Sequence, residues 1–318
     1  MYSRTYTFSQ LQGSIWGFVV GDALGVPVEF EPRVVLKSFP VKHMRGYGTH
    51  KQPQGTWSDD SSLLFCTMES LCQGYNLQDM AKKFIEWYRN GLWTPYGQVF
   101  DVGNTTRNGI LNLEKGNLVH EATLNDERSI GNGSLMRILP IVFWVSKMSI
   151  NERFEIIKQV SSLTHAHLRS VLACFIYVEF MWQLIENKTL RKAYENTQLL
   201  VNDFCDRQYF LKAEAKHFHR ILQEDISKYK ESEISSTGYV VHTLEAALWS
   251  FFTGNNYEEV TTLAVNLGDD TDTTGAIAGS MAGLYYGLDS IPEDWRDVIA
   301  RKMDILFLIE KFYHALNK

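Results

Sequence analysis

The sequence predicts an all-α protein, and two features carry this prediction. Apolar residues recur at helical spacing through most of the chain, for example at positions 84–88 and 244–252, whereas the alternating runs typical of strands are nearly absent. Ser or Thr also stands ahead of several apolar runs, where its side chain can accept the first free N–H groups of a helix. We therefore expect roughly a dozen helices of about 8 to 20 residues.

The capping residues place the helix starts in chain order. We expect helices to begin after Ser9, Ser58, Thr164 and Thr237, each of which precedes an apolar run. Between the first two, residues 27–58 carry glycines and prolines without helical spacing, which predicts a long irregular segment. A segment of that length in a compact protein usually has a functional role or wraps the surface.

Two segments carry glycines at every fourth position, which places each set on one face of a helix. An interior glycine costs about 1 kcal/mol relative to alanine in helix propensity, so a stripe of them needs a packing reason. A face without side chains lets the backbone of a neighbouring helix come close. We therefore expect two central, tightly packed helices, which carry Gly17, Gly21 and Gly25 on one stripe and Gly275, Gly279, Gly283 and Gly287 on the other.

The composition indicates a single globular domain over residues 1–318. Hydrophobic residues make up 45% and charged residues 21% of the chain, and no Gly/Ser-rich or Pro-rich linker interrupts it. The formal net charge of -6 comes without a long basic or acidic block. We therefore expect neither a nucleic-acid partner nor a membrane, and consider a small molecule or a protein-borne group as the partner instead.

The cysteines and the N-terminal residues favour a cytoplasmic location. Four cysteines, at positions 66, 72, 174 and 205, are too sparse for a disulfide scaffold and form no C-x-x-C site. Residues 1–12 include Arg4 and several polar side chains but no apolar core of a signal peptide. We expect reduced thiols and no export by this route.

Two acidic segments, each ahead of an expected helix, carry the functional signal. In the first, Asp59 and Asp60 follow Ser58, which on its own is typical of helix capping. The second, residues 269–274, places three carboxylates and three hydroxyls in a short space. So many like charges raise one another's pKa unless a cation neutralises them. An all-oxygen donor set favours Mg²⁺ or Mn²⁺ over Zn²⁺, and the two segments could share a binuclear centre if the fold brings them together.

Other polar residues are weaker candidates. Glu29 and Asp101 are each, taken alone, more typical of a cap or a solvated acid than of a catalyst. The loop 131–137, which ends in Arg137, is a candidate cradle for an anion such as pyrophosphate, although Gly-Asn-Gly is also simply a turn. His165 and His167 do not face each other on a helix, which favours a hydrogen bond from one of them to a substrate over a shared metal.

The order of the motifs resembles the ADP-ribosylglycohydrolase family, which includes the dinitrogenase-reductase-activating glycohydrolases. The resemblance runs from about residue 8 to residue 288 and rests on five motifs in family order. They are Gly-Asp-Ala-Leu-Gly at 21–25 with Glu29, Gly-Thr-Trp-Ser-Asp-Asp at 55–60, Phe-Asp-Val-Gly at 100–103, Gly-Asn-Gly-Ser-Leu-Met-Arg at 131–137, and Asp-Thr-Asp-Thr at 270–273 followed by Gly-Ala-Ile-Ala-Gly at 275–279.

The resemblance implies a compact, single-domain orthogonal bundle of helices with two Mg²⁺ or Mn²⁺ ions. By motif, the implied metal ligands are Ser58, Asp59, Asp60, Asp270, Asp272 and Thr273. The implied catalytic acids are Glu29, beside the metals, and Asp101, near the scissile ribose. The implied substrate-binding residues are Asn132, Gly133, Ser134 and His165.

Three departures from the family pattern stand out. Asp269 replaces the glycine usual before the Asp-Thr-Asp-Thr run, and adds a charge that either supports the ligands or alters the metal preference. Ser58 replaces a common threonine and keeps the hydroxyl. His167 and Leu168 replace an Asp-Pro pair, which puts the residues on the leaving-group side in doubt. None of these changes removes an implied ligand, so we expect an active enzyme.

The implied function is metal-dependent removal of ADP-ribose from a modified protein, with arginine as the first-choice linkage. We expect the metals to bind ribose hydroxyls and orient a water, and Glu29 or Asp101 to manage proton transfer through an oxocarbenium-like transition state, without an assignment of acid and base. Serine-linked ADP-ribose, O-acetyl-ADP-ribose and a modified base remain open. Two other roles also remain open. One is an immunity protein that neutralises a cognate ADP-ribosyltransferase by occlusion or hydrolysis, and the other is a purely structural, crystallin-like descendant of the family.

Overall fold

The computed structural model describes residues 6–117, 127–186 and 189–317, and this part of the chain is all-α, as predicted. It contains sixteen α-helices, and no residue in these ranges lies in a β-strand. The eleven longer helices are α1 (Phe8–Gly25), α3 (Asp59–Leu71), α4 (Leu77–Asn90), α5 (Asn104–Glu114), α7 (Ile150–Ser161), α8 (Leu168–Glu186), α9 (Leu190–Arg207), α12 (Val240–Thr253), α13 (Tyr257–Asn266), α14 (Thr271–Tyr286) and α16 (Lys302–Ala315).

Five short helices account for the difference from the expected dozen. They have four to seven residues, which is too short for apolar periodicity to reveal them. They are α2 (Arg33–Ser38), α6 (Leu139–Trp144), α10 (Tyr209–Ala215), α11 (His219–Leu222) and α15 (Glu293–Asp297).

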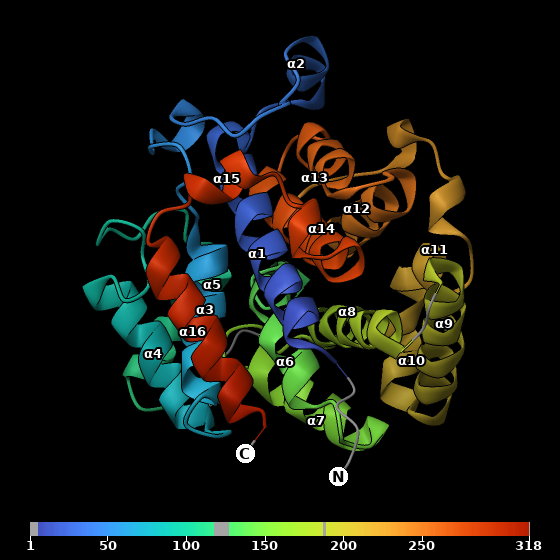
Figure 1. Cartoon of the computed structure of the whole chain (residues 1–318). Helices are drawn as coiled ribbons and strands as arrows, with labels where there is room; N and C mark the ends of the chain where they lie inside the picture. Colours follow the sequence, from blue (N-terminus) through green and yellow to red (C-terminus); the bar gives the residue numbers. More distant parts are fainter. Residues whose placement is uncertain (1–5, 118–126, 187–188, 318) are drawn as a thin grey trace.

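Helices α1 and α14 lie side by side at the centre of the molecule (Figure 1). The other helices surround this pair: α12 and α13 pack on α14, α8 crosses beneath it, α3, α4 and α16 form one flank, and α9 to α11 form the other (Figure 1). The buried side chains of these elements belong to one hydrophobic cluster. The first and the last thirds of the chain therefore meet in the core.

The glycine stripes explain this central contact, as predicted. A Cβ atom added to Gly17 would lie well under 3.0 Å from the carbonyl oxygen of Gly279, and one added to Gly21 would meet that of Gly275 equally closely. Gly13, which was not part of the predicted stripe, extends it and packs against Gly283. Gly287 was placed on the stripe wrongly: it ends α14 with φ 88° and has open space around it, as is typical of a C-terminal cap.

Of the four predicted helix caps, only Ser58 was right; the other three helices begin near the expected place but have different capping groups. The Ser58 side chain accepts the N–H of Asp60 and so caps α3. Helix α1 begins at Phe8, two residues earlier than expected, because Thr7 and Gln10 form a capping box. Thr237 does not cap α12; its hydroxyl bonds to the ring of His242 instead.

Helix α8 also lacks the predicted threonine cap. It begins at Leu168, and the N–H of Arg169 donates to Nδ1 of His167. The Thr164 hydroxyl faces inward, where it accepts a hydrogen bond from Arg137. A histidine ring thus takes the capping place that the sequence pattern gave to threonine.

The segment 27–58 is less irregular than expected. It contains α2 and two single 3₁₀ turns, Val26–Val28 (η1) and Gly48–His50 (η2). Arg33, the first residue of α2, anchors the segment by donating to the carbonyl oxygens of Leu267, Glu231 and Ile234. The segment therefore folds back over the start of α14 and is held beside it.

Within the described ranges, two stretches, Phe8–Val28 and Leu168–Glu186, are long and apolar enough to cross a membrane by length and composition. In the fold, 94% and 78% of these stretches are buried among other helices. Such burial is typical of the central helices of a globular protein.

Candidate metal centre and substrate pocket

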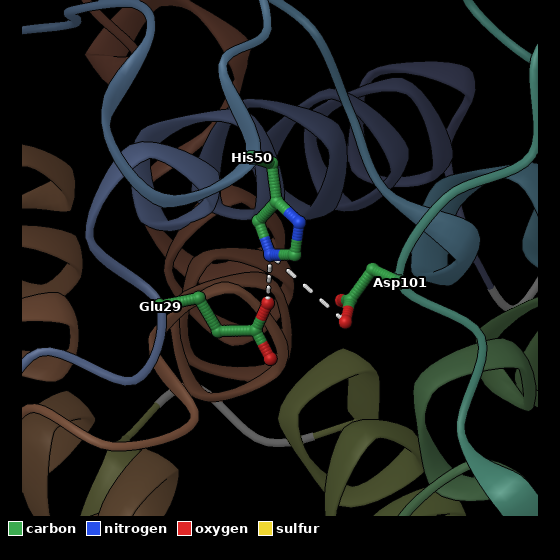
Figure 2. Close-up of side chains that lie close together, drawn as sticks. All are labelled: Glu29, His50 and Asp101. Atoms are coloured by element: carbon green, nitrogen blue, oxygen red, sulfur yellow. Dashed lines mark hydrogen bonds and ion pairs between the residues drawn. The ribbon is translucent and has the colours of Figure 1, made fainter.

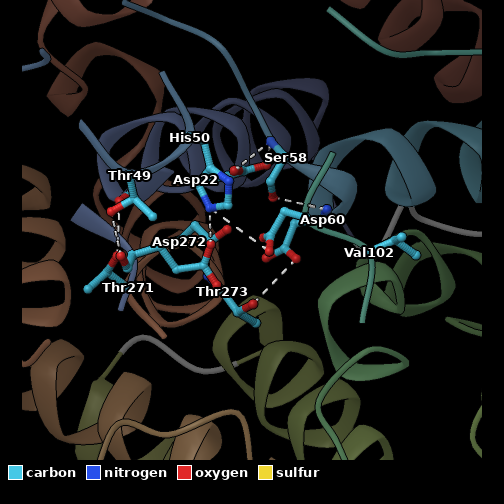
Figure 3. A network of polar contacts seen from close by, with 12 residues as sticks. Asp22, Thr49, His50, Ser58, Asp60, Val102, Thr271, Asp272 and Thr273 are labelled. Carbon is cyan, nitrogen blue, oxygen red and sulfur yellow. Dashed lines mark hydrogen bonds and ion pairs between the residues drawn. The ribbon is translucent and has the colours of Figure 1, made fainter. Parts of the chain in front are cut away.

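The two acidic segments meet at the starts of α3 and α14 (Figure 3). The Thr273 hydroxyl donates to Oδ1 of Asp60, 3.3 Å away and 213 positions earlier in the chain. The meeting depends on the glycine stripe, since a Cβ on Gly25 at the end of α1 would collide with the backbone of Asp272. The structure therefore satisfies the geometric condition for a shared centre.

A further carboxylate, Asp22, supports this arrangement and was not assigned a role from the sequence. It is fully buried on α1 and accepts hydrogen bonds from the N–H of Ser58 (2.9 Å), the N–H of Ser61 (3.0 Å) and the hydroxyl of Ser61 (2.5 Å). Burial raises the pKa of Asp22 to about 6. Asp22 thus fixes the start of α3, and with it the position of Asp59 and Asp60. The available signal was a lone acid within an apolar helix.

The residues of both segments fit a divalent cation. Among the described residues, Oδ2 of Asp60, Oδ1 of Asp270 and Oδ2 of Asp272 are buried without a hydrogen-bond partner. One carboxylate oxygen from each of Glu29, Asp270 and Asp272 also lies within 4.8 Å of the other two. A buried oxygen without a donor is costly, and carboxylate oxygens are the ligands that Mg²⁺ and Mn²⁺ prefer. The acidic cluster can therefore hold a metal.

The electrostatics lead to the same conclusion. Burial, together with the charges of the neighbouring carboxylates, raises the pKa values of Asp59, Asp60 and Asp272 well above their usual range. Burial also raises the pKa of Asp270, against a hydrogen bond from Asn132. Without a cation, these groups can ionise only at the expense of stability.

We expect the metal-free protein to become less stable as the pH rises from about 5 to 8. The site carboxylates have raised pKa values in the folded state, so that state holds more protons than the unfolded chain, and its free energy of unfolding falls with pH. At pH 7.5, Mg²⁺ or Mn²⁺ at about 100 times its dissociation constant should add about 2.7 kcal/mol per site and raise Tm by about 5 °C. Thermal unfolding with metal and with chelator measures both effects; equal Tm values would contradict a metal site.

A pocket of about 260 Å³ opens beside the acidic cluster. It is lined by residues of both acidic segments and of five other parts of the chain: Glu29, Phe30, Asp59, Asp60, Asp101, Gly103, Asn104, Thr105, Thr106, Gly131, Asn132, Gly133, Met136, His165, Gly238, Asp270 and Thr273. Four of the six proposed ligands therefore share one pocket with five of the residues singled out for catalysis or substrate binding, namely Glu29, Asp101, Asn132, Gly133 and His165.

Gly133 and His165 form one wall of this pocket. A Cβ on Gly133 would lie 2.7 Å from Cε1 of His165 and 2.5 Å from the Thr106 hydroxyl, so only glycine fits there. Burial, with the charge of Arg137, lowers the pKa of His165 to about 3, which keeps the ring neutral. Nδ1 of the ring lies 2.8 Å from the Thr164 hydroxyl. The ring is thus fixed in place as a neutral hydrogen-bonding group.

Asn132 connects the pocket loop to the second acidic segment. Its side-chain amide donates to Oδ2 of Asp270 at 2.9 Å and to the Thr243 hydroxyl at 3.0 Å. Both amide hydrogens are therefore engaged, and the side chain orients Asp270.

Two residues of the loop 131–137 point away from the pocket. Ser134 is fully buried, does not line the pocket, and accepts a hydrogen bond from the Ser161 hydroxyl. Arg137 is also fully buried and donates to the carbonyl oxygens of Val160 and Ser161. The suggestion that Arg137 contacts an anion was wrong, because its guanidinium instead pairs with free carbonyl groups at the end of α7.

Glu29 and Asp101 both line the pocket, and their carboxyl groups lie beside the ring of His50 (Figure 2). Nε2 of His50 lies 2.5 Å from Oε2 of Glu29 and 3.9 Å from Oδ1 of Asp101. Burial, with the charges of Asp272 and Asp270, raises the pKa of Glu29 to about 11. Burial, with the charges of Asp59 and Glu29, raises the pKa of Asp101 to about 10. His50 was missed from the sequence, where no spacing connects it to either acid.

Asp269 does not belong to the acidic cluster. Its side chain is exposed, and its backbone adopts a left-handed conformation with φ 59°. Its N–H donates to the carbonyl oxygen of Glu31, and its own carbonyl accepts the N–H of Phe30. This conformation explains the glycine of the family pattern, and aspartate is one of the few other residues that tolerate it. Among the described residues, the Asp269 side chain makes no hydrogen bond or ion pair with a proposed ligand. Its charge therefore has no contact through which it could support the ligands or change the metal preference.

Comparison with known proteins agrees with this geometry. The sequence model of the ADP-ribosylglycohydrolase family matches residues 3–318. The chain is 30% identical to ADP-ribosylarginine hydrolase Tri1 of Serratia proteamaculans (strain 568), over 97% of this chain and 80% of that protein. It is 28% identical to ADP-ribosyl-[dinitrogen reductase] glycohydrolase of Rhodospirillum rubrum, over 92% and 90%, and 23% identical to human ADP-ribosylhydrolase ARH3, over 95% and 94%.

A solved structure shows the same fold. It is described as an ADP-ribosylglycohydrolase-related protein complex, and it superposes with a TM-score of 0.78 at 30% identity, over 97% of this chain and 98% of that chain. Together with the match of the family model along almost the whole sequence, this likeness means that the chain belongs to the ADP-ribosylglycohydrolase family.

Proposed function

We propose that this enzyme releases ADP-ribose from arginine side chains of modified proteins, with two Mg²⁺ or Mn²⁺ ions in its acidic cluster. The observation that carries the metal proposal is the set of three buried carboxylate oxygens, on Asp60, Asp270 and Asp272, that have no partner among the described residues. The arginine linkage is supported by the two similar Tri1 proteins, both of which are named ADP-ribosylarginine hydrolases.

The residues that would hold the ions are those of the two helix starts. Asp60, Asp270 and Asp272 offer the free oxygens, and Ser58, Asp59 and Thr273 complete the proposed ligand set. When bound, divalent ions supply positive charge that orients ribose hydroxyls and a water molecule. Asp22 and Asn132 contribute indirectly, because they fix the start of α3 and the carboxylate of Asp270.

The remaining pocket residues suit cleavage at the anomeric carbon. Such a reaction needs one group that donates a proton to the leaving atom and one that accepts a proton from water. Glu29 and Asp101 are the two carboxyl groups of the pocket outside the proposed ligand set, and both have raised pKa values that favour holding a proton. We propose that these two share the proton transfers, while Gly133 and the neutral ring of His165 bind the substrate.

The decisive experiment measures free ADP-ribose released from arginine-linked, serine-linked and O-acetyl-linked substrates, with Mg²⁺, with Mn²⁺ and with chelator. We expect release from the arginine linkage that chelator abolishes and added metal restores. Release from another linkage alone would overturn the arginine assignment. No release from any of the three would favour an occluding, toxin-neutralising role, which a pull-down with an ADP-ribosyltransferase would then test.

A further inference from the structure

We infer that His50 is a positioning residue that holds the carboxylate of Glu29 in the pocket by a hydrogen bond from Nε2. The inference deepens the proposed hydrolase function and rests on it. The two atoms are 2.5 Å apart, and both side chains are largely buried, with 15% and 5% of their surfaces exposed (Figure 2). An ionised carboxylate only accepts hydrogen bonds, so the ring nitrogen is the donor when Glu29 is charged.

Glu29 needs such a partner because of its surroundings. Its carboxyl group lies within 4.8 Å of oxygens from Asp270 and Asp272, which offer it no hydrogen bond when they are ionised. Among the described residues, its side chain has no ion pair with Lys or Arg. The hydrogen bond from His50 gives Glu29 a donor and fixes the direction of its carboxyl group.

The turn that carries His50 is fastened to the segment that carries Glu29. Gly48 has φ 64°, and a Cβ there would run into the carbonyl oxygen of Pro27, so the two backbones touch. The Thr49 hydroxyl donates to the backbone carbonyl oxygen of Glu29 at 2.7 Å. Thr49 thus holds the main chain of Glu29, and His50 holds its side chain. Removal of the His50 ring leaves the first two contacts in place.

Two aromatic rings lie beside the imidazole of His50. The ring centroids of Phe30 and Phe100 lie 6.1 Å and 5.3 Å from that of His50. Phe30 directly follows Glu29, and Phe100 directly precedes Asp101. The same two segments therefore supply both acids and the packing that orients the ring. Because Nε2 is 3.9 Å from Asp101, beyond hydrogen-bond distance, the hydrogen bond of this nitrogen goes to Glu29 and not to Asp101.

Steady-state kinetics of three metal-loaded variants test the inference. We expect His50→Ala to lower kcat at least about tenfold, as for loss of one charged hydrogen bond, with KM and Mn²⁺ affinity changed less than about twofold. His50→Gln, whose amide can donate from a similar position, should recover most of kcat. His43→Ala removes an exposed histidine of the same segment and should match the wild type. A rise in KM with unchanged kcat, or a kcat that His50→Gln does not recover, would overturn the positioning role.

A double-mutant cycle separates positioning from a direct role. If His50 acts through Glu29, His50→Ala should cause no further loss of kcat in a Glu29→Gln background; losses that multiply would refute the inference.

An NMR measurement does not depend on turnover. In the metal-loaded protein, the Nε2–H proton of His50 should give a downfield signal that Glu29→Ala removes and His43→Ala leaves unchanged. A signal indifferent to Glu29→Ala would overturn the hydrogen bond. A wild type that shows the signal but releases no ADP-ribose would instead overturn the proposed function.

Discussion

Asp60→Asn is expected to lower ADP-ribose release by more than about a thousandfold while the protein stays folded. The substitution keeps the size of the side chain but removes a negative charge and half of its metal-binding oxygens. A bound divalent ion contributes several kcal/mol of charge stabilisation to the transition state, and about 4 kcal/mol corresponds to a thousandfold change in rate. Initial rates and circular dichroism of the purified variant measure the two parts of this prediction.

The matched control is Asp269→Asn, in the second acidic segment. It makes the same chemical change, but this side chain is exposed and stands outside the cluster, so activity and Mn²⁺ affinity should stay within about twofold of the wild type. Calorimetry should show weakened Mn²⁺ binding for Asp60→Asn alone. If Asp60→Asn retained activity, or if both variants lost it equally, the ligand assignment would be wrong.

The sequence predicted the chemical groups of the site better than their arrangement. Adjacent carboxylates such as Asp59 and Asp60 are visible as a cluster in one dimension, because several like charges in a few residues need an explanation wherever they fold. The sequence predicted a shared metal centre only on the condition that the two acidic segments meet. The glycine stripes were interpreted as a helix-packing feature and were not connected with that meeting. The structure shows that the two features are connected: the contact that holds α1 against α14 ends with Gly25 against the backbone of Asp272.

The residues that were missed or misassigned act through partners far away in the sequence. Asp22 accepts the N–H of Ser58, 36 positions later, and His50 reaches back 21 positions to Glu29. Each is a single polar residue without a repeating pattern, so only the folded chain reveals its partner. Arg137 was misassigned because a charged residue in a glycine-rich loop suits an anion and a free helix end equally well.

Gly279→Ala tests the central contact, and here two physical effects predict opposite signs. Helix propensity alone predicts that alanine stabilises α14 by about 1 kcal/mol. The structure predicts the reverse, because the new Cβ would lie well under 3.0 Å from the carbonyl oxygen of Gly17, a backbone atom that cannot turn away. We expect a loss of about 3 kcal/mol in the free energy of unfolding, or about 6 °C in Tm.

The same substitution should also weaken metal binding, although Gly279 lies two turns from the acidic segment. Forcing α1 and α14 apart moves Asp22, and hence the start of α3, away from Asp272. Gly103→Ala is the control, since its Cβ would meet open space and its backbone has φ -61°; replacing this N-cap glycine of α5 should cost less than about 1 kcal/mol. Chemical denaturation measures the sign directly. Stabilisation by Gly279→Ala would mean that α1 and α14 do not touch as the structure shows. Destabilisation with unchanged Mn²⁺ affinity would mean that this contact supports the fold but does not set the distance between the two acidic segments.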